Sequence, residues 1–255
     1  MSDGVAVITL NRPDVLNAFD MEMITALQNR LQEAERDAAV RCLLLTGAGR
    51  GFSAGQDLAA RADRSQPRVK GSTAEYLRQT FNPIVLKIRA LEKPVIAAIN
   101  GPVVGASLGV ALACDIRFAA DSAKLLAGFA KIGLACDAGV GWLLPQLVGM
   151  ARAMEFLFSG DPLDAARAER WGLVNRVYPA DTLMDEAMAY AKRLAQGPTR
   201  AIGLMKRAVN RSRELELAAF LDYEALVQDA AAQTADNREG VAAFMEKRAP
   251  LFKGK

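Results

Sequence analysis

The chain has 255 residues, 51% of them hydrophobic and 24% charged, which suits one large or two modest globular domains and excludes a disordered or fibrous protein. It contains no histidine, which excludes a Ser-His-Asp triad, a Cys-His dyad and a histidine-ligated metal, so proton transfer falls to carboxylates, Lys, Tyr, Cys or water. The net charge of +3 is too small to imply a nucleic-acid partner, although a slightly basic surface would suit an anionic ligand.

The first half of the chain predicts strands and helices in alternation. Residues 4–10 (GVAVITL) are apolar and β-branched and stop at NRPD, which is typical of a strand followed by a turn. A helix is predicted from Asp20, a suitable N-cap, because apolar residues then recur at helical spacing. The apolar run RCLLLTG predicts a buried strand, which ends in the glycine-rich loop GAGRGFSAGQDL.

A similar unit follows a charged, exposed connection at residues 59–72. We predict a helix over 73–92, a strand and turn in KPVIAAINGP, a helix in VVGASLGVALAC and a strand in DIRFAAD. No charged residue lies between Lys93 and Asp115, but Asn100, Gly101 and Pro102 interrupt this stretch, so buried elements explain it better than a membrane span. Alternating units of this kind favour an α/β architecture.

The second half is predicted to be mainly helical from about residue 150, with one short strand in LVNRVYP. We divide the chain into a core over 1–190 and a helical C-terminal region over 191–255, which packs against the core or another subunit. The cysteines Cys42, Cys114 and Cys136 are odd in number and lie in apolar runs, which predicts reduced thiols in a cytoplasmic protein. The N-terminus shows no secretory signal.

Two glycine-rich segments follow predicted strands. Gly101, Gly105 and Gly109 are four residues apart, which on a helix makes a face that admits another backbone or a ligand; tight helix packing alone is the alternative. The loop GRGFSAGQDL matches no nucleotide-binding fingerprint, since Phe52 stands where a glycine is needed. Both segments offer backbone N–H groups, and two such loops facing each other would form an oxyanion hole.

Five segments together resemble the crotonase, or enoyl-CoA hydratase/isomerase, superfamily: NRPDVLNAF, GAGRGFSAGQDL, KPVIAAINGPVVGASLGVALACDIRFA, FAKIGLACDAGVGWLLPQLVG and REGVAAFMEKRAPLF. Within it, the chain is most similar to the bacterial 2-(1,2-epoxy-1,2-dihydrophenyl)acetyl-CoA isomerases of phenylacetate degradation. The resemblance implies an α/β fold, a spiral of strand-strand-helix turns with a helical C-terminal trimerisation region. It also implies a homotrimer or hexamer that acts on an acyl-CoA thioester. It implies no metal or redox cofactor, since CoA counts as part of the substrate.

The resemblance also implies roles for individual residues. The backbone N–H groups of Ala54 and Ala106 would hold the thioester oxygen, with Ala106 in place of the more usual glycine. CoA contacts carry over to a set of residues in the first two loops: Leu16, Ala18, Ser53, Gln56, Asp57 and Leu58. Phe244 and Lys247 would reach the CoA of a neighbouring subunit; the alternative is an ordinary amphipathic helix with Phe244 in the core.

The chain departs from the hydratase pattern, because Gly109 and Phe129 stand where hydratases carry two glutamates. Asp137, in GLACDAGVGW, remains as the carboxylate at the position that related isomerases use. In apolar surroundings its pKa should exceed the usual value of about 3.9, so we expect it to move a proton along the acyl chain or to assist rearrangement of an epoxide. The alternatives are that Asp137 only caps a helix beginning at Ala138, that the protein is an enoyl-CoA hydratase, or that it is a non-catalytic CoA-thioester-binding scaffold.

Overall fold

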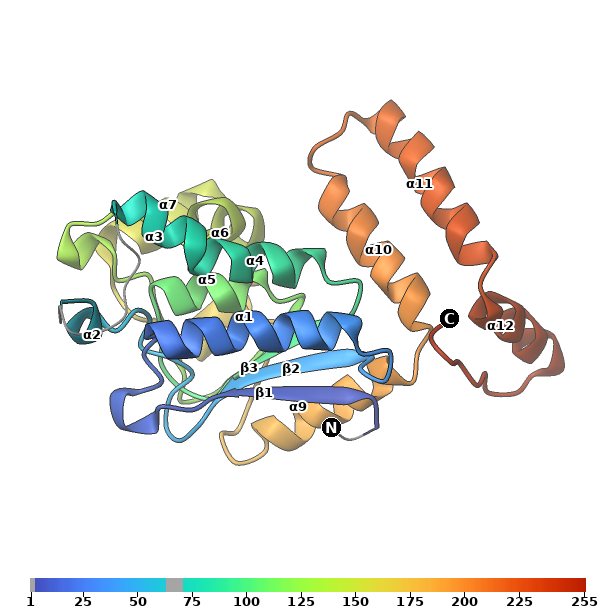
Figure 1. The fold of residues 1–255 in the computed structure, drawn as a ribbon, viewed down its shortest axis with the longest axis horizontal. Helices are drawn as coiled ribbons and strands as arrows, with labels where there is room; N and C mark the ends of the chain where they lie inside the picture. Colours follow the sequence, from blue (N-terminus) through green and yellow to red (C-terminus); the bar gives the residue numbers. More distant parts are fainter. Residues whose placement is uncertain (1–2, 63–70) are drawn as a thin grey trace.

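The computed structural model describes residues 3–62 and 71–255, and its central element is a parallel sheet (Figure 1). The five strands lie in the order β1-β2-β3-β5-β8 and are all parallel to their neighbours. Their bounds are β1 Val5–Leu10, β2 Cys42–Gly47, β3 Val95–Ile99, β5 Ile116–Ala120 and β8 Arg176–Tyr178. Every residue of β2 and β3 is buried, as expected for central strands of a parallel sheet covered on both faces. The predicted strands and the α/β class are confirmed.

Helices cover both faces of this sheet. Figure 1 shows α1 (Met21–Arg36) on one face and α9 (Leu183–Ala195) on the other, and α4 (Phe81–Ala90) packs beside α1. Asp20 is the N-cap of α1, and its side chain accepts a hydrogen bond from the Met23 N–H at 2.8 Å, as predicted. The remaining elements of the core are η1 Pro13–Val15, α2 Leu58–Ala62, η2 Ala130–Ile132, α6 Val140–Val148, α7 Met150–Ser159 and α8 Ala165–Arg170.

A second, smaller sheet lies beside the candidate site. It contains β4 (Val103–Val104), β6 (Lys124–Leu126) and β7 (Leu163–Asp164), with β4 and β6 parallel and β6 and β7 antiparallel. The helix predicted over residues 103–114 therefore begins later than expected: its first two residues form β4, and α5 runs from Ala106–Ala113. All eight residues of α5 are buried, because its small side chains let neighbouring elements approach on every side.

The single helix predicted over residues 73–92 is wrong, since the structure has two helices, α3 (Thr73–Gln79) and α4, that meet at Thr80. Pro83 lacks the N–H that would bond to the Gln79 carbonyl in a continuous helix. The side-chain amide of Gln28, on α1, donates instead to the carbonyls of Gln79 and Thr80 at 3.0 and 2.9 Å. The predicted connection at residues 59–72 falls mostly on residues 63–70, outside the described residues.

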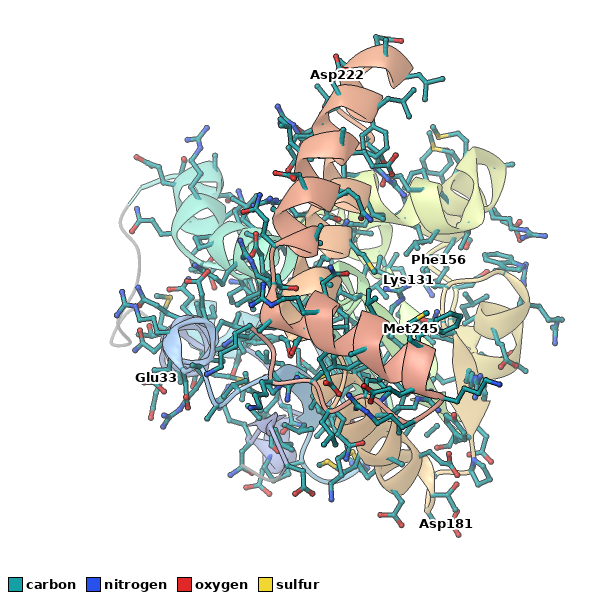
Figure 2. All side chains as sticks on the ribbon, turned by 90° about the vertical axis from the view of Figure 1, so that its right-hand side faces the viewer. Glu33, Lys131, Phe156, Asp181, Asp222 and Met245 are labelled. Atoms are coloured by element: carbon teal, nitrogen blue, oxygen red, sulfur yellow. The ribbon has the colours of Figure 1, made fainter. Side chains whose placement is uncertain are left out.

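The C-terminal helices form an arm that projects from the core (Figure 1). They are α10 (Thr199–Arg211), α11 (Leu217–Ala232) and α12 (Ala235–Glu246). Figure 2 looks onto this side of the molecule, with Asp222 on α11 and Met245 on α12. The arm exposes many large apolar side chains: Met205, Val209, Leu217, Leu221, Leu226, Val241, Phe244 and Met245. This is more exposed apolar surface than a helix that faces only water usually presents. The predicted division of the chain at residue 190 stays a prediction.

No helix in the described part of the chain combines the length and apolar character that crossing a bilayer requires.

Candidate active site

The side chain of Asn17 joins the loop that follows β1, called the first loop, to the loop that follows β2, called the second loop. Asn17 is fully buried, and its amide donates to the carbonyls of Ala48 and Gly51, both at 2.8 Å. Its side-chain oxygen accepts from the Arg12 N–H at 2.8 Å. Asn17 also has a φ of 55°, in the left-handed region that asparagine tolerates better than most residues. The first loop is thus held against the second, and the sequence analysis did not identify Asn17 for this role.

Two serine hydroxyls connect the second loop to its neighbours: Ser53 to the first loop and Ser107 to the start of α5. Ser53 Oγ donates to the Asn17 carbonyl at 2.7 Å and accepts from the Gly55 N–H at 3.1 Å. Ser107 Oγ lies 2.8 Å from the Ser53 carbonyl and accepts from the Val104 N–H at 3.0 Å. Both serines are fully buried, so this network fixes the backbone of both loops before any ligand arrives.

Removing one hydroxyl of this network should measurably weaken the fold. We expect Ser107→Ala to lower the free energy of unfolding by about 0.5–1.5 kcal/mol, because the buried Ser53 carbonyl and Val104 N–H each lose one hydrogen bond but keep their bond to each other at 3.1 Å. Urea denaturation measures the difference. Ser212→Ala is the matched control, since the exposed Ser212 hydroxyl contacts only the Val209 carbonyl, and it should change stability by less than about 0.5 kcal/mol. Equal effects of the two substitutions would contradict the structural role of Ser107.

The N-terminus of α5 lies next to the second loop. A Cβ added to Gly55 would lie 2.5 Å from the Val104 carbonyl oxygen and 3.7 Å from the Ala106 nitrogen, so only glycine permits this approach. The Ala106 N–H is in the first turn of the helix and donates no hydrogen bond within the described part of the chain. It can therefore receive a hydrogen-bond acceptor, and its contact with a thioester oxygen stays a prediction.

The predicted role of Ala54 needs correction. Its N–H donates to the Leu16 carbonyl at 2.8 Å, so it is already used to join the two loops. Phe19 bonds to the residues on either side of Gln56. The Phe19 N–H donates to the Gly55 carbonyl at 2.7 Å, and the Asp57 N–H donates to the Phe19 carbonyl at 3.0 Å. In this parallel bridge the peptide N–H of Gln56 points away from Phe19, toward the opposite edge of the loop. Of the two residues, Gln56 rather than Ala54 therefore has its N–H directed away from the contact between the loops.

Gly109, one of the two positions expected to carry a hydratase glutamate, has no room for any side chain. A Cβ built there would lie 2.2 Å from the Ala138 carbonyl oxygen and 2.7 Å from the Ala138 Cβ. The turn that follows Asp137 therefore packs directly on α5. Phe129, the other position, is buried, and its ring lies 3.9 Å from where a Gly105 Cβ would be. An aromatic ring thus borders the start of α5.

The turn at Asp137 is not a simple helix cap. The helix α6 begins at Val140 and its N-cap residue is Gly139, so the predicted alternative of a helix starting at Ala138 is wrong. Ala138 and Gly139 have φ values of 48° and 77°, and the Val140 N–H donates to the Asp137 main-chain carbonyl at 2.9 Å. Asp137 is half-buried, and the tight turn after it holds it beside α5.

The residues predicted to contact CoA have different surroundings. The prediction that Ser53 contacts CoA is wrong, because Ser53 is fully buried and its N–H, carbonyl and hydroxyl all bond within the protein. Asp57 accepts from the Ala60 N–H at 2.9 Å and pairs with Arg12 at 3.0 Å, and these contacts lower the pKa of the Asp57 carboxyl. Leu58 is 52% exposed, Leu16 is half-buried and Ala18 is buried. Their contacts with CoA stay predictions.

Phe244 and Lys247 lie on the arm. Phe244, on α12, is 82% exposed, so the alternative that placed it in the core is wrong. Lys247 ends the helix with a φ of 54° and is also exposed. Figure 1 shows α12 at the opposite end of the molecule from α2 and α5, so within one chain these residues do not reach the candidate site.

The three cysteines differ in accessibility. Burial, with a smaller contribution from Asp115, raises the pKa of both the Cys42 and the Cys114 thiol to about 12, whereas Cys136 is exposed. We expect a thiol reagent at pH 8 to modify Cys136 alone in the folded protein and all three cysteines after denaturation. Counting the released chromophore checks this, and the Cys136→Ser variant should then show no fast reaction. Rapid modification of a second thiol would contradict the burial of Cys42 and Cys114.

In the described ranges, no three His, Cys, Asp or Glu side chains are grouped so that they could hold a metal ion.

Comparisons with known proteins cover the whole chain. The family model for enoyl-CoA hydratase/isomerase matches residues 1–255. The 1,2-epoxyphenylacetyl-CoA isomerase of Escherichia coli is 46% identical over 254 residues, covering 99% of this chain and 96% of the relative. A protein of Rhodobacter capsulatus named "Probable enoyl-CoA hydratase" is 41% identical over 256 residues, covering 100% and 96%. The crystal structure of an enoyl-CoA hydratase from Bacillus anthracis superposes with a TM-score of 0.89 at 34% identity, covering 99% of this chain and 96% of that one.

Proposed function

Because the chain belongs to the enoyl-CoA hydratase/isomerase family, we propose that it is an acyl-CoA isomerase that shifts a double bond or rearranges an epoxide. The observation that carries this proposal is the packing of the Asp137 turn onto α5 at Gly109. It leaves one carboxylate from that turn beside the helix that carries one of the two proposed backbone donors, Ala106. Isomerisation needs one group that takes and returns a proton, which suits this arrangement.

In the proposed reaction the N–H groups of Gln56 and Ala106 hold the oxygen of the thioester carbonyl. The Asp137 carboxylate removes a proton from the acyl chain, and the electron pair moves into the carbonyl to give an enolate. The two backbone donors stabilise the negative charge on the enolate oxygen. The proton then returns to a different carbon, so the double bond moves and no atom is gained or lost. For an epoxide, the same carboxylate assists opening of the ring.

Hydration is the less favoured activity. A hydratase of this family uses two glutamates, and the contact of Gly109 with Ala138 excludes a side chain at one of these positions. The name of the Rhodobacter capsulatus relative keeps hydration as an alternative. The Escherichia coli relative is named as an isomerase of an epoxide, and its identity of 46% supports the proposal. A non-catalytic CoA-binding role is the third possibility, because a binding module needs the donors but no carboxylate.

A substrate assay in deuterated water separates these activities. The purified chain is incubated separately with a 3-enoyl-CoA, a 2-enoyl-CoA and 1,2-epoxyphenylacetyl-CoA, and the products are separated by liquid chromatography and then analysed by mass spectrometry. Isomers of unchanged composition from the first or third substrate support the proposal, and deuterium in the product reports exchange of the transferred proton with solvent. Addition of water to the 2-enoyl-CoA alone would indicate a hydratase. Binding of all three thioesters without any product would indicate the scaffold role.

We further propose a cytoplasmic homotrimer or hexamer in which α12 completes the CoA site of a neighbouring subunit. The exposed apolar side chains of the arm and the distance of α12 from α5 in one chain support this arrangement.

The cation at residue 247 allows a direct test of this assembly. We expect Lys247→Gly to raise the KM for an acyl-CoA about tenfold with little change in kcat, because a phosphate of CoA loses a charged partner. Glycine suits the left-handed backbone at this position, so the fold should persist. Lys253→Gly is the control, as a second C-terminal lysine with no assigned contact to CoA, and should leave KM unchanged. An unchanged KM in Lys247→Gly would remove Lys247 from the CoA site.

A further inference from the structure

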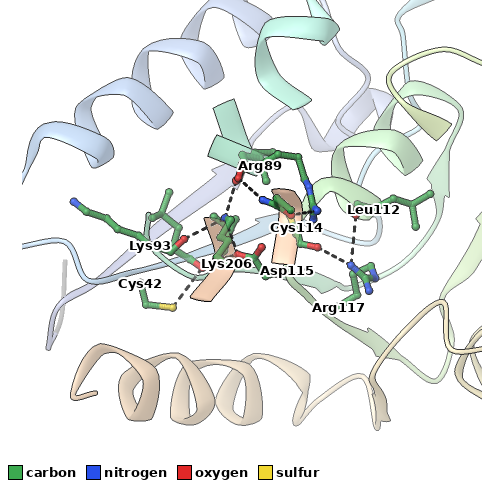
Figure 3. Close-up of polar contacts among 12 residues, drawn as sticks. Cys42, Arg89, Lys93, Leu112, Cys114, Asp115, Arg117 and Lys206 are labelled. Carbon is green, nitrogen blue, oxygen red and sulfur yellow. Dashed lines mark hydrogen bonds and ion pairs between the residues drawn. The ribbon is translucent and has the colours of Figure 1, made fainter. Parts of the chain in front are cut away.

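A cluster of buried charged side chains lies at the C-terminal end of α5, away from the candidate active site. Figure 3 shows Arg89, Asp115, Arg117 and Lys206 gathered around Cys114. Lys206, from α10, donates to the Asp115 carboxylate and to the Ile88 carbonyl at 2.8 and 2.7 Å. These contacts join the first helix of the arm to the core, and they pair the Asp115 carboxylate with one cation.

A cavity of about 80 Å³ opens beside this cluster, and its polar lining is mainly basic. The charged residues that line it are Arg89, Asp115, Arg117 and Arg213. Three guanidinium groups thus face one carboxylate, and that carboxylate already accepts hydrogen bonds from Lys206 and from the Val95 N–H, both at 2.8 Å. The positive charge of the cavity is therefore not compensated by its own lining.

Arg117 has one donor open to the cavity. Only 5% of this residue is exposed, its Nε donates to the Leu173 carbonyl at 2.7 Å, and its Nη1 donates to the Cys114 carbonyl at 2.6 Å. Its Nη2 forms no hydrogen bond with the residues that the structure describes, and it is not enclosed by protein atoms, while the side chain lines the cavity. A cationic donor held in this way can bond to an acceptor in the cavity without rearrangement of the protein.

The other two arginines have donors to spare. Arg89 uses Nη2 to bond Asn210, while its Nε and Nη1 bond to nothing in the described part of the chain. Arg213 lies with its guanidinium carbon 5.8 Å from the centre of the Trp142 ring, and it forms no ion pair with a described carboxylate. The pKa of Arg89 is lowered, mainly by burial. Asp115 opposes this change, whereas the like charge of the nearby Arg213 adds to it.

A neighbouring cavity of about 180 Å³ differs in its charge balance. It is lined by Arg89, Lys206, Arg207 and Arg211, but Arg211 pairs with Glu214 and Arg207 with Glu92. These carboxylates neutralise their partners without any ligand. The excess of positive charge is therefore confined to the smaller cavity beside Arg117.

We propose that the cavity beside Arg89, Arg117 and Arg213 is a binding site for one small inorganic oxyanion of the phosphate or sulfate type. Arginine presents its N–H groups as a planar fork that matches the oxygens of such an anion. A space of about 80 Å³ can hold several waters or one small oxyanion, and it is well below the size of pockets that take ligands as large as an acyl-CoA. The site is thus distinct from the one proposed for substrate.

The test measures binding of inorganic phosphate to the whole chain by isothermal titration calorimetry, in a zwitterionic buffer with ionic strength held constant by sodium chloride. We expect saturable binding and a melting temperature that rises with phosphate concentration, because a ligand of the folded state stabilises it. Arg213→Gln and Arg89→Gln should each weaken binding about tenfold or more, since a charge-assisted hydrogen bond is lost. Arg213 is exposed, so its replacement keeps the fold.

Arg211→Gln is the matched control, because Arg211 is a near neighbour of Arg213 that lines the other cavity and pairs with Glu214. It should bind phosphate as tightly as the wild type. Absence of saturable binding, or binding that neither Arg89→Gln nor Arg213→Gln weakens, would overturn the proposal. A change of oligomeric state in Arg213→Gln without phosphate binding by the wild type would assign the cavity to a carboxylate of a second copy instead. None of these readouts depends on turnover of an acyl-CoA.

Discussion

The Asp137→Asn variant should lose about 10²- to 10⁴-fold in kcat for isomerisation, the range that a positioned acid or base contributes. Asparagine keeps the shape of the side chain but cannot accept and return a proton. The turn itself is held by the bond from the Val140 N–H to the Asp137 main-chain carbonyl, which the substitution retains. Stability should therefore change by less than about 0.5 kcal/mol. Steady-state kinetics with whichever of the three thioesters the wild type converts, together with urea denaturation, measure both effects.

Replacement of a different aspartate, Asp161, by asparagine provides the control. Asp161 is an exposed carboxylate whose nearest described cation is Lys131, at 3.7 Å. Asp161→Asn removes one negative charge from the surface and should leave kcat unchanged. If Asp137→Asn retains the wild-type kcat, Asp137 does not carry the proton, and the donors of the oxyanion hole would have to act with another group. If both variants lose activity equally, the effect comes from the net charge of the protein rather than from position 137.

Adding one methyl group at Gly109 should have the second large effect. In Gly109→Ala the new Cβ would lie 2.2 Å from the Ala138 carbonyl oxygen, so the turn after Asp137 must move away from α5. We expect a loss of about 1–3 kcal/mol in the free energy of unfolding, as for other overpacked cores. We also expect kcat to fall, because the displaced turn carries Asp137. Kinetics at a temperature where the variant is fully folded separate the loss of activity from the loss of stability.

Gly240→Ala is the matched control for this substitution. Gly240 also lies within a helix, but its nearest neighbour, a carbon of the Phe252 ring, would be at an ordinary contact distance of 3.4 Å. Alanine favours a helix by up to about 1 kcal/mol over glycine, so this variant should be as stable as the wild type or slightly more stable. A Gly109→Ala variant with the stability and activity of Gly240→Ala would show that the Asp137 turn is not held against α5.

Elements that depend on local patterns were predicted correctly from the sequence. The apolar runs of β2 and β3 and the capping of α1 by Asp20 need only neighbouring residues, and these predictions are confirmed. The break at Thr80 had a local signal in Pro83, which the prediction of a single helix overlooked. The bonds from Gln28, on α1, to the carbonyls exposed there could not be predicted, because Gln28 is distant in the sequence. Long-range contacts of this kind leave no periodic pattern in the chain.

The same limit applies to the candidate site. Glycine-rich segments after strands indicated where backbone donors would gather, and in the structure α5 begins at Ala106, as expected for a donor there, although its role stays a prediction. The choice between Ala54 and Gln56 depends on the register of the bridge between Phe19 and Gln56, which no local pattern reveals. The packing of Gly109 on Ala138 likewise depends on the meeting of two separate segments. The left-handed backbone at Asn17 could have been suspected from the sequence, since asparagine is enriched at such positions. Its three side-chain hydrogen bonds could not.

Both proposed oxyanion donors belong to the main chain, and this has a consequence for how a donor can be lost. A substitution at Gln56 or Ala106 cannot delete the N–H group, unless proline is introduced. Loss of a donor must therefore come from a shift of the backbone rather than from a change of side chain. Residues that fix this backbone, such as the buried Asn17 and Ser107, should then control activation of the thioester although their own side chains do not contact it.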